Sequence, residues 1–216
     1  MTLFVQTFRY AAEPFFFSHS TKENPFRVYA QVMNLFVIVC SFIFLGVMLY
    51  IDIVKRFIGP DFRSGLGVVP ILLLANLCIG VFYNLSIWYK LTSKTKWGAW
   101  LSIFGALVTL VFNFCLIPIL GYMGAAWTTL ICYASMMILS YCMGQKHYPV
   151  PYDVRAFVYH ISLALFMWWI SLLIRNHFNL SEKLTLVVNT LIFILFAVTI
   201  WVFERKKINY LRGINN

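Results

Sequence analysis

Long apolar stretches separated by short polar segments make up most of the chain. Six of them have about the 20 residues that a helix needs to cross the hydrocarbon core of a bilayer: Ala30–Ile51, Gly67–Leu91, Trp97–Leu120, Tyr122–Gly144, Ala156–Ile174 and Leu184–Phe203. Only helices fit, because an unpaired backbone group in lipid costs several kcal/mol. The pattern predicts an all-α integral membrane protein with six full transmembrane helices.

The first seventeen residues follow a different pattern. Thr2, Gln6, Arg9 and Glu13 recur every three or four positions, which places them on one stripe of a helix, and most of the remaining positions are apolar. One interpretation is an amphipathic helix that lies flat on the membrane. The other is a partial transmembrane helix whose polar stripe faces a watery cavity. The pattern alone favours neither.

Composition supports a membrane environment and argues against a nucleic-acid partner. Hydrophobic residues make up 62% of the 216 residues and charged residues 11%, whereas soluble domains have about 25% charged residues. The formal net charge of +10 comes from Lys and Arg in the short gaps between apolar stretches, as at the ends of membrane spans. We therefore expect membrane lipids as partners, and no nucleic acid.

The distribution of basic residues predicts the orientation. Five lie in the segments on one side, namely Lys55, Arg56, Arg63, Arg175 and Lys183. Eleven lie on the side of the C-terminus, namely Lys22, Arg27, Lys90, Lys94, Lys96, Lys146, Arg155, Arg205, Lys206, Lys207 and Arg212. Because basic residues are retained in the cytoplasm, the C-terminus is expected to be cytoplasmic.

Neither a cofactor nor catalysis is indicated. The five cysteines lie inside apolar stretches without a CxxC pair, and the four histidines are scattered without metal-ligand spacing. No Ser, His and acidic set suggests a nucleophilic triad. We therefore expect the protein to bind no metal and no cofactor, and we do not expect it to be an enzyme.

Several segments, in order along about two-thirds of the chain, resemble the polysaccharide transporter (O-antigen flippase-like) family of the multidrug, oligosaccharidyl-lipid and polysaccharide exporter superfamily. They are Phe8–Phe17, Val69–Asn76, Tyr83–Lys90, Lys94–Lys96, Asn113 with Ile117-Pro118, Gly121–Trp127, Gly144–Lys146 and Tyr148–Tyr152. Beyond Tyr152 only the hydropathy of two helices is similar.

The resemblance implies the C-terminal lobe and terminal helix pair of a fourteen-helix flippase. Residues 1–17 would be the end of helix eight, as a partial transmembrane or cavity helix, and residues 30–144 helices nine to twelve. Residues 156–203 would be the terminal helix pair and residues 204–216 a basic cytoplasmic tail. The N-terminal lobe and helix seven would be missing, which implies a truncated reading frame or a second chain that supplies them.

By the same resemblance, the protein would be a partial flippase of lipid-linked oligosaccharide units. It would work by alternating access in the bacterial inner membrane, in polysaccharide or lipopolysaccharide biosynthesis. Its partners would be the lipid-linked oligosaccharide and the N-terminal lobe. The alternatives are an inactive or structural fragment that needs the other half, a multidrug exporter, and a membrane glycan-modifying enzyme.

Two charged residues are the main candidates for substrate binding. Arg9 and Glu13 lie four residues apart on one helical face and can pair with each other. The resemblance implies a cavity for a diphosphate-linked lipid, and a guanidinium group suits phosphate. Arg9 is therefore expected to contact the substrate phosphate and Glu13 to orient Arg9. The alternative is a structural ion pair.

Three asparagines and three lysines complete the candidate site. Asn76 and Asn84 belong to one stripe of small and amide side chains and Asn113 to another, which fits either a polar lumen that binds substrate or close helix packing. Lys90, Lys94 and Lys96 form a basic segment suited to anionic lipid headgroups, as a topological anchor or a first contact with a lipid diphosphate.

Overall fold

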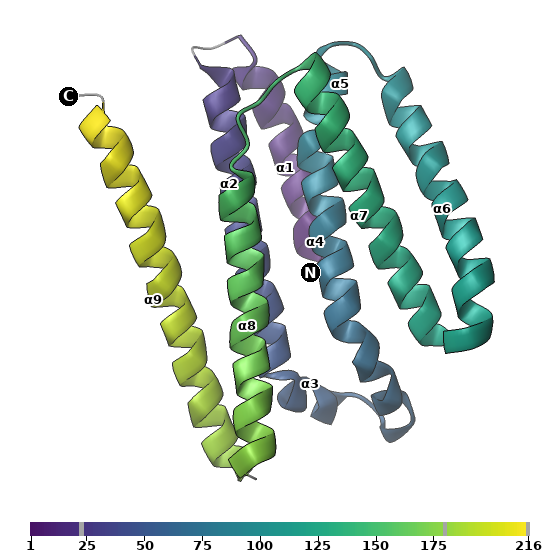
Figure 1. Cartoon of the computed structure of the whole chain (residues 1–216), viewed down its shortest axis with the longest axis vertical. Coiled ribbons are helices and arrows are strands. Elements are labelled where there is room, and N and C mark those ends of the chain that lie inside the picture. The colour runs from purple at the N-terminus through teal and green to yellow at the C-terminus, as the bar shows by residue number, and fades with distance from the viewer. Residues whose placement is uncertain (22–23, 179–180, 215–216) are drawn as a thin grey trace. The chain divides into compact units, whose positions relative to one another are not determined.

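The computed structural model describes residues 1–21, 24–178 and 181–214, with side chains except at 61, 62, 64, 178 and 206–214. The described residues are almost entirely helical (Figure 1). The elements are α1 (Thr2–His19), α2 (Pro25–Leu49), α3 (Ile51–Phe57), the 3-10 helix η1 (Pro60–Val68), α4 (Val69–Leu85), α5 (Ile87–Leu91), α6 (Lys96–Leu120), α7 (Tyr122–His147), α8 (Val154–Phe178) and α9 (Glu182–Ile214).

Within the described residues, six helical segments are long and apolar enough to cross a membrane, which confirms the predicted number of spans. They are Pro25–Leu49, Gly65–Leu91, Lys96–Leu120, Tyr122–His147, Val154–His177 and Glu182–Arg205. The first begins five residues before the predicted Ala30, because Pro25 fits the first helical turn, where its missing N–H is not needed. The second is interrupted at Ser86, between α4 and α5.

The chain forms two compact units. The first comprises residues 1–37 and 60–153, and the second residues 38–59 and 154–216, so that the boundary falls within α2. In the first unit α4 packs against α1 and α7, and α6 packs against the other side of α7 (Figure 1). In the second unit α8 and α9 form an antiparallel hairpin.

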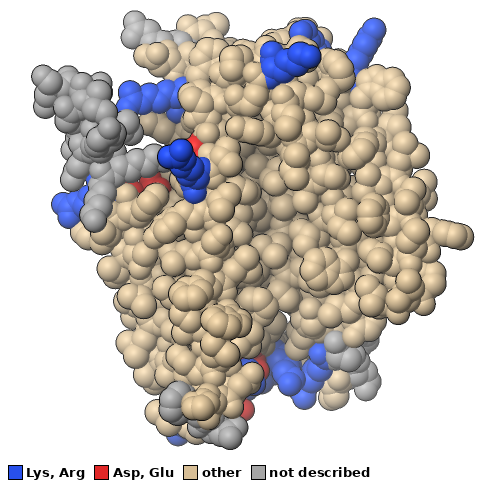
Figure 2. Space-filling view, viewed as in Figure 1, with Lys and Arg blue, Asp and Glu red and all other residues tan. Residues whose placement is uncertain are grey.

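In both units, charged and apolar side chains occupy different parts of the helices. The Lys, Arg, Asp and Glu side chains visible in Figure 2 lie toward the helix ends, and other residues cover the surface between them. Large apolar side chains are exposed along the candidate spans, for example Leu110 and Phe114 on α6 and Leu191 on α9. Such surface is costly in water and favourable against lipid tails.

The α6–α7 hairpin turns at Gly121, whose φ of 57° is unfavourable for other residues. Gly124 then allows the two helices to approach closely, since a Cβ atom there would lie 2.4 Å from the carbonyl oxygen of Leu116. The two helices are therefore closely packed next to the turn.

The turn between α5 and α6 closes with a Schellman motif. The Lys94 N–H donates to the carbonyl of Tyr89 at 2.8 Å, and the Ser93 N–H donates to that of Lys90 at 3.4 Å. Ser93 has a φ of 56°, in the left-handed region that this motif requires at its penultimate position. A residue with a side chain thus holds a conformation that normally favours glycine.

In the second unit, buried polar contacts join α9 to the end of α2. Asn189, which is 5% exposed, donates its side-chain amide to the Leu49 carbonyl at 2.6 Å. Its side-chain oxygen accepts a hydrogen bond from Ser171 of α8 at 2.7 Å. Asn189 therefore satisfies one of the carbonyls that the last turn of α2 leaves unpaired.

Candidate functional site

The site is built where α1 runs alongside α4 in the same direction. The Thr2 hydroxyl donates to the side-chain oxygen of Asn76 at 3.0 Å, and the Arg9 guanidinium lies 4.5 Å from the centre of the Tyr83 ring. Farther along, Lys90 of α5 donates to Glu13. Because α1 packs lengthwise against a candidate span, the geometry fits a cavity helix better than one flat on the membrane.

Glu13 is the centre of a small charge cluster. Its Oε1 accepts a hydrogen bond from the Arg9 Nε at 3.2 Å and a second, short one from the Lys90 ammonium. The Arg9 and Glu13 side chains are each 37% exposed, and that of Lys90 is 22% exposed. Two cations and one anion leave the cluster with an excess of one positive charge, part of which is open to the surroundings.

The protonation states of the cluster are fixed by its own contacts. Burial disfavours the charged form of Glu13, but the hydrogen bonds and charges of Lys90 and Arg9 outweigh it and lower the pKa of Glu13. Burial likewise opposes the charge of Arg9, yet Glu13 and Tyr83 raise its pKa further. Arg9 and Glu13 are therefore both ionised near neutral pH.

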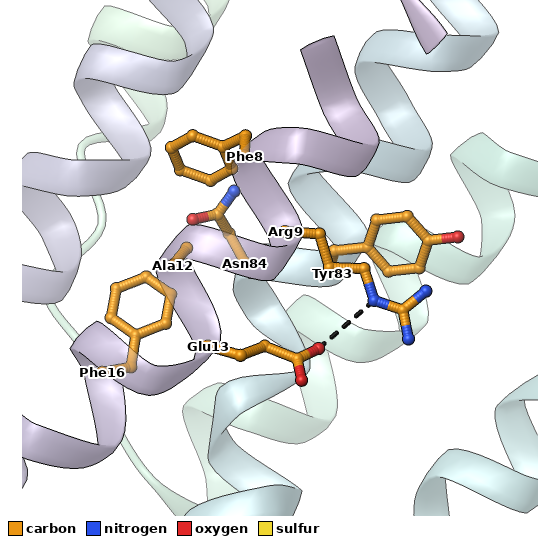
Figure 3. A pocket seen from close by; sticks show the side chains of 7 residues that line it. All are labelled: Phe8, Arg9, Ala12, Glu13, Phe16, Tyr83 and Asn84. Carbon is orange, nitrogen blue, oxygen red and sulfur yellow. Dashed lines mark hydrogen bonds and ion pairs between the residues drawn. The ribbon is translucent and has the colours of Figure 1, made fainter. Parts of the chain in front are cut away.

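A small hollow lies beside the cluster (Figure 3). Its volume of about 10 Å³ is enough for one water molecule, so a diphosphate group does not fit inside it. A larger anion would have to meet the exposed side of Arg9. The hollow is lined by Phe8, Arg9, Ala12, Glu13, Phe16, Tyr83 and Asn84.

The amides of α4 engage mainly in local packing. Asn76 donates to the carbonyl of Leu72 at 2.7 Å, and Asn84, which is 3% exposed, donates to that of Gly80 at 3.1 Å. Gly80 itself is covered by the Phe36 ring, which would lie 2.2 Å from an added Cβ atom. These contacts favour the packing interpretation of the stripe, although Asn84 also reaches the hollow.

The remaining predicted residues lie apart from the cluster. Asn113 is on α6 and does not line the hollow, and its buried side-chain oxygen accepts no hydrogen bond from the described residues. Lys94 is exposed in the turn before α6 and Lys96 at the first position of α6, as suits a headgroup contact. Lys90, predicted to act with them, is instead joined to Glu13.

The contact of Tyr83 with the Arg9 guanidinium was not predicted from the sequence. The spacing of residues along the chain is nevertheless consistent with it. Asn76, Tyr83 and Lys90 are spaced by seven residues, as are Thr2 and Arg9, and a spacing of seven keeps residues on one side of two helices packed lengthwise. This spacing is compatible with α1 lying lengthwise along α4.

No group of three His, Cys, Asp or Glu residues able to hold a metal ion occurs among the residues that the structure describes. No protein-family model, curated protein or solved structure matches the chain.

Proposed function

We propose that this chain is the C-terminal part of a flippase for lipid-linked oligosaccharide units in the bacterial inner membrane. It would act with an N-terminal lobe, encoded by the same gene or by a second chain, and alternate between two access states. The C-terminus would be cytoplasmic, as the distribution of basic residues indicates. The proposal draws on the ordered resemblance to polysaccharide transporters and on six candidate spans.

The observation that carries the proposal is the half-exposed Arg9 in a cluster with a net positive charge. An isolated charge at membrane depth is costly, and such residues usually face a cavity, a partner or a substrate. Arg9 uses its Nε for Glu13, so its two terminal nitrogens remain on the side away from that contact (Figure 3). A guanidinium held in this way suits a phosphate oxygen pair.

In this mechanism Glu13 orients Arg9, and Lys90 compensates the Glu13 charge. The lipid diphosphate would bind at the exposed side of Arg9, because the hollow itself holds about one water molecule. The lipid tail would remain in the bilayer during the change of access, and the missing lobe would provide the opposite wall of the cavity.

The test is complementation of a flippase-deficient bacterial strain by this chain together with a candidate N-terminal half. We expect export with the wild-type chain, a loss of at least about tenfold with Arg9→Ala, which corresponds to about 1.4 kcal/mol, and partial rescue with Arg9→Lys. Arg56→Ala is the matched control, since Arg56 pairs with the 82% exposed Glu182 in the second unit. Normal export with Arg9→Ala would remove Arg9 as the phosphate contact.

A structural role is the second candidate, and a specific observation favours it. Each charge of the cluster has a partner within the chain, so the cluster also serves to fasten α1 to the α4–α5 segment. On this account Arg9→Ala lowers the amount of inserted protein, and export falls only in proportion. Quantifying inserted protein in the complementation assay separates the two roles.

A further inference from the structure

A second buried ionisable contact lies in the terminal helix pair, outside the candidate site. The Nε2 atom of His160 on α8 is 3.1 Å from the Oε1 atom of Glu204 on α9. His160 is 0% exposed and the Glu204 side chain 20% exposed. Both residues lie within candidate spans, where ionisable side chains are rare and usually functional.

The surroundings of His160 are aromatic. The centre of its ring lies 5.6 Å from that of Tyr159 on the same helix and 5.8 Å from that of Phe203, and Tyr159 stacks on Phe203 with ring centres 4.4 Å apart. Glu204 and Tyr159 are titratable groups next to His160. The next cation on α9, Arg205, has its guanidinium over the Trp201 ring at 4.7 Å.

The hydrogen-bond geometry assigns different roles to the two ring nitrogens. A carboxylate has no proton to donate, so Nε2 of a neutral imidazole must donate to Glu204. Nδ1 then carries a lone pair, and this buried atom has no hydrogen-bond partner among the described residues. The position for an additional proton is therefore Nδ1.

We propose that His160 and Glu204 form a proton-binding site in the α8–α9 pair, with the proton taken up at Nδ1 of His160. Hydronium delivers the proton and becomes water, an N–H bond forms, and the imidazole becomes an imidazolium. The net charge of the two side chains changes from −1 to zero. Proton binding thus places a positive charge beside the carboxylate and converts a hydrogen bond into an ion pair between the helices.

Histidine is the side chain that pH-dependent switches in proteins commonly use to bind a proton. The site is independent of the proposed flippase activity, because it uses none of the residues around Arg9.

The test is nitrogen NMR of the protein in lipid nanodiscs, with 15N-labelled histidine and His19, His147 and His177 replaced by Gln. His160 is then the only source of histidine signal. We expect its Nδ1 resonance to change from the unprotonated to the protonated type as the pH falls from 8 to 5. In Glu204→Gln the midpoint should fall by about one pH unit or more, because the anionic partner is lost.

Glu182→Gln is the matched control, since Glu182 is an exposed carboxylate at the opposite end of the same helix. It should leave the midpoint unchanged. Two results would overturn the proposal: an Nδ1 resonance of one type throughout pH 5–8, or a midpoint that Glu204→Gln does not move. The first would show that the charge of the pair does not change over this range, and the second would separate the titration from Glu204.

Discussion

Glu13 makes the ion pair that joins α1 to α5. A single carboxylate accepts from two cations on different helices, one of them 77 positions away in sequence. Its partners depend on its negative charge, so the contact must weaken when the carboxyl group is protonated. This makes the fastening of α1 sensitive to acid.

The pKa of Glu13 is lowered in the folded protein, so its contribution to stability is present above the ordinary value of about 4.5 and disappears as the pH falls below it. We expect wild-type thermal stability to fall over this acidic range by more than that of Glu13→Gln. For a partly exposed pair the difference is about 0.2–1 kcal/mol. The measurement is thermal unfolding in nanodiscs as a function of pH.

Glu182→Gln provides the comparison for this pH profile. Glu182 also pairs with an arginine, but both side chains are largely exposed, at 82% and 65%. Its profile should follow the wild type. If Glu13→Gln followed the wild type as well, Glu13 would not contribute to the acid sensitivity.

Ser93 provides a residue-scale prediction about the backbone. Its left-handed conformation costs a residue with a Cβ atom about 1–2 kcal/mol, whereas glycine adopts it freely but loses more entropy on folding. Ser93→Gly should therefore raise the free energy of unfolding by up to about 1 kcal/mol. Ser93→Ala keeps the Cβ atom and should not. Equal stabilisation by both variants would point to the hydroxyl group instead.

At the scale of elements, hydrogen bonds to one asparagine connect three helices of the second unit. Asn189→Ala leaves the Leu49 carbonyl and the Ser171 hydroxyl without this partner. We expect a loss of about 0.6–1.7 kcal/mol, as for interhelical hydrogen bonds in other membrane proteins. Steric trapping in mixed micelles measures the free energy of unfolding. Thr199→Ala, whose hydroxyl bonds within α9 to Leu195, should change little.

Sequence reasoning succeeded for elements defined by apolar length and was weaker where contacts are polar. Runs such as Trp97–Leu120 coincide almost completely with α6, because the bilayer sets both length and composition. The segment between the first two predicted spans, residues 52–66, folds mostly as the short helices α3 and η1. Short helices of this kind depend on local caps and neighbours, which leave little trace in hydropathy.

One part of the candidate site could be predicted from the sequence, because it depends only on spacing within a helix. The Arg9–Glu13 pair follows from helical spacing alone, since i and i+4 side chains meet on one face. The contact of Lys90 with Glu13 is long-range and needs the alignment of α1 with α4. Nothing in the sequence around His160 indicated that Glu204, 44 positions away, would face it.

For the whole molecule, the distribution of basic residues predicts which segments share a side of the membrane. We expect a cysteine at Lys183 to react with a membrane-impermeant maleimide in intact cells. A cysteine at Lys94 should react only after permeabilisation, because the C-terminal side is proposed to be cytoplasmic. Both variants need the five native cysteines replaced first. The opposite pattern would invert the proposed orientation.

Helix α6 packs against α7 along one side, and this affects how its tilt responds to the bilayer. Leu101 and Gly105 are the buried residues of α6, so in a bilayer most of its other side chains would face lipid. Its 25 residues extend about 37 Å, against a hydrocarbon thickness of about 30 Å. Hydrophobic mismatch of this size is relieved by tilt, at fractions of a kcal/mol per Å. Bilayer thickness should therefore set the inclination of α6 more directly than that of helices held on several sides.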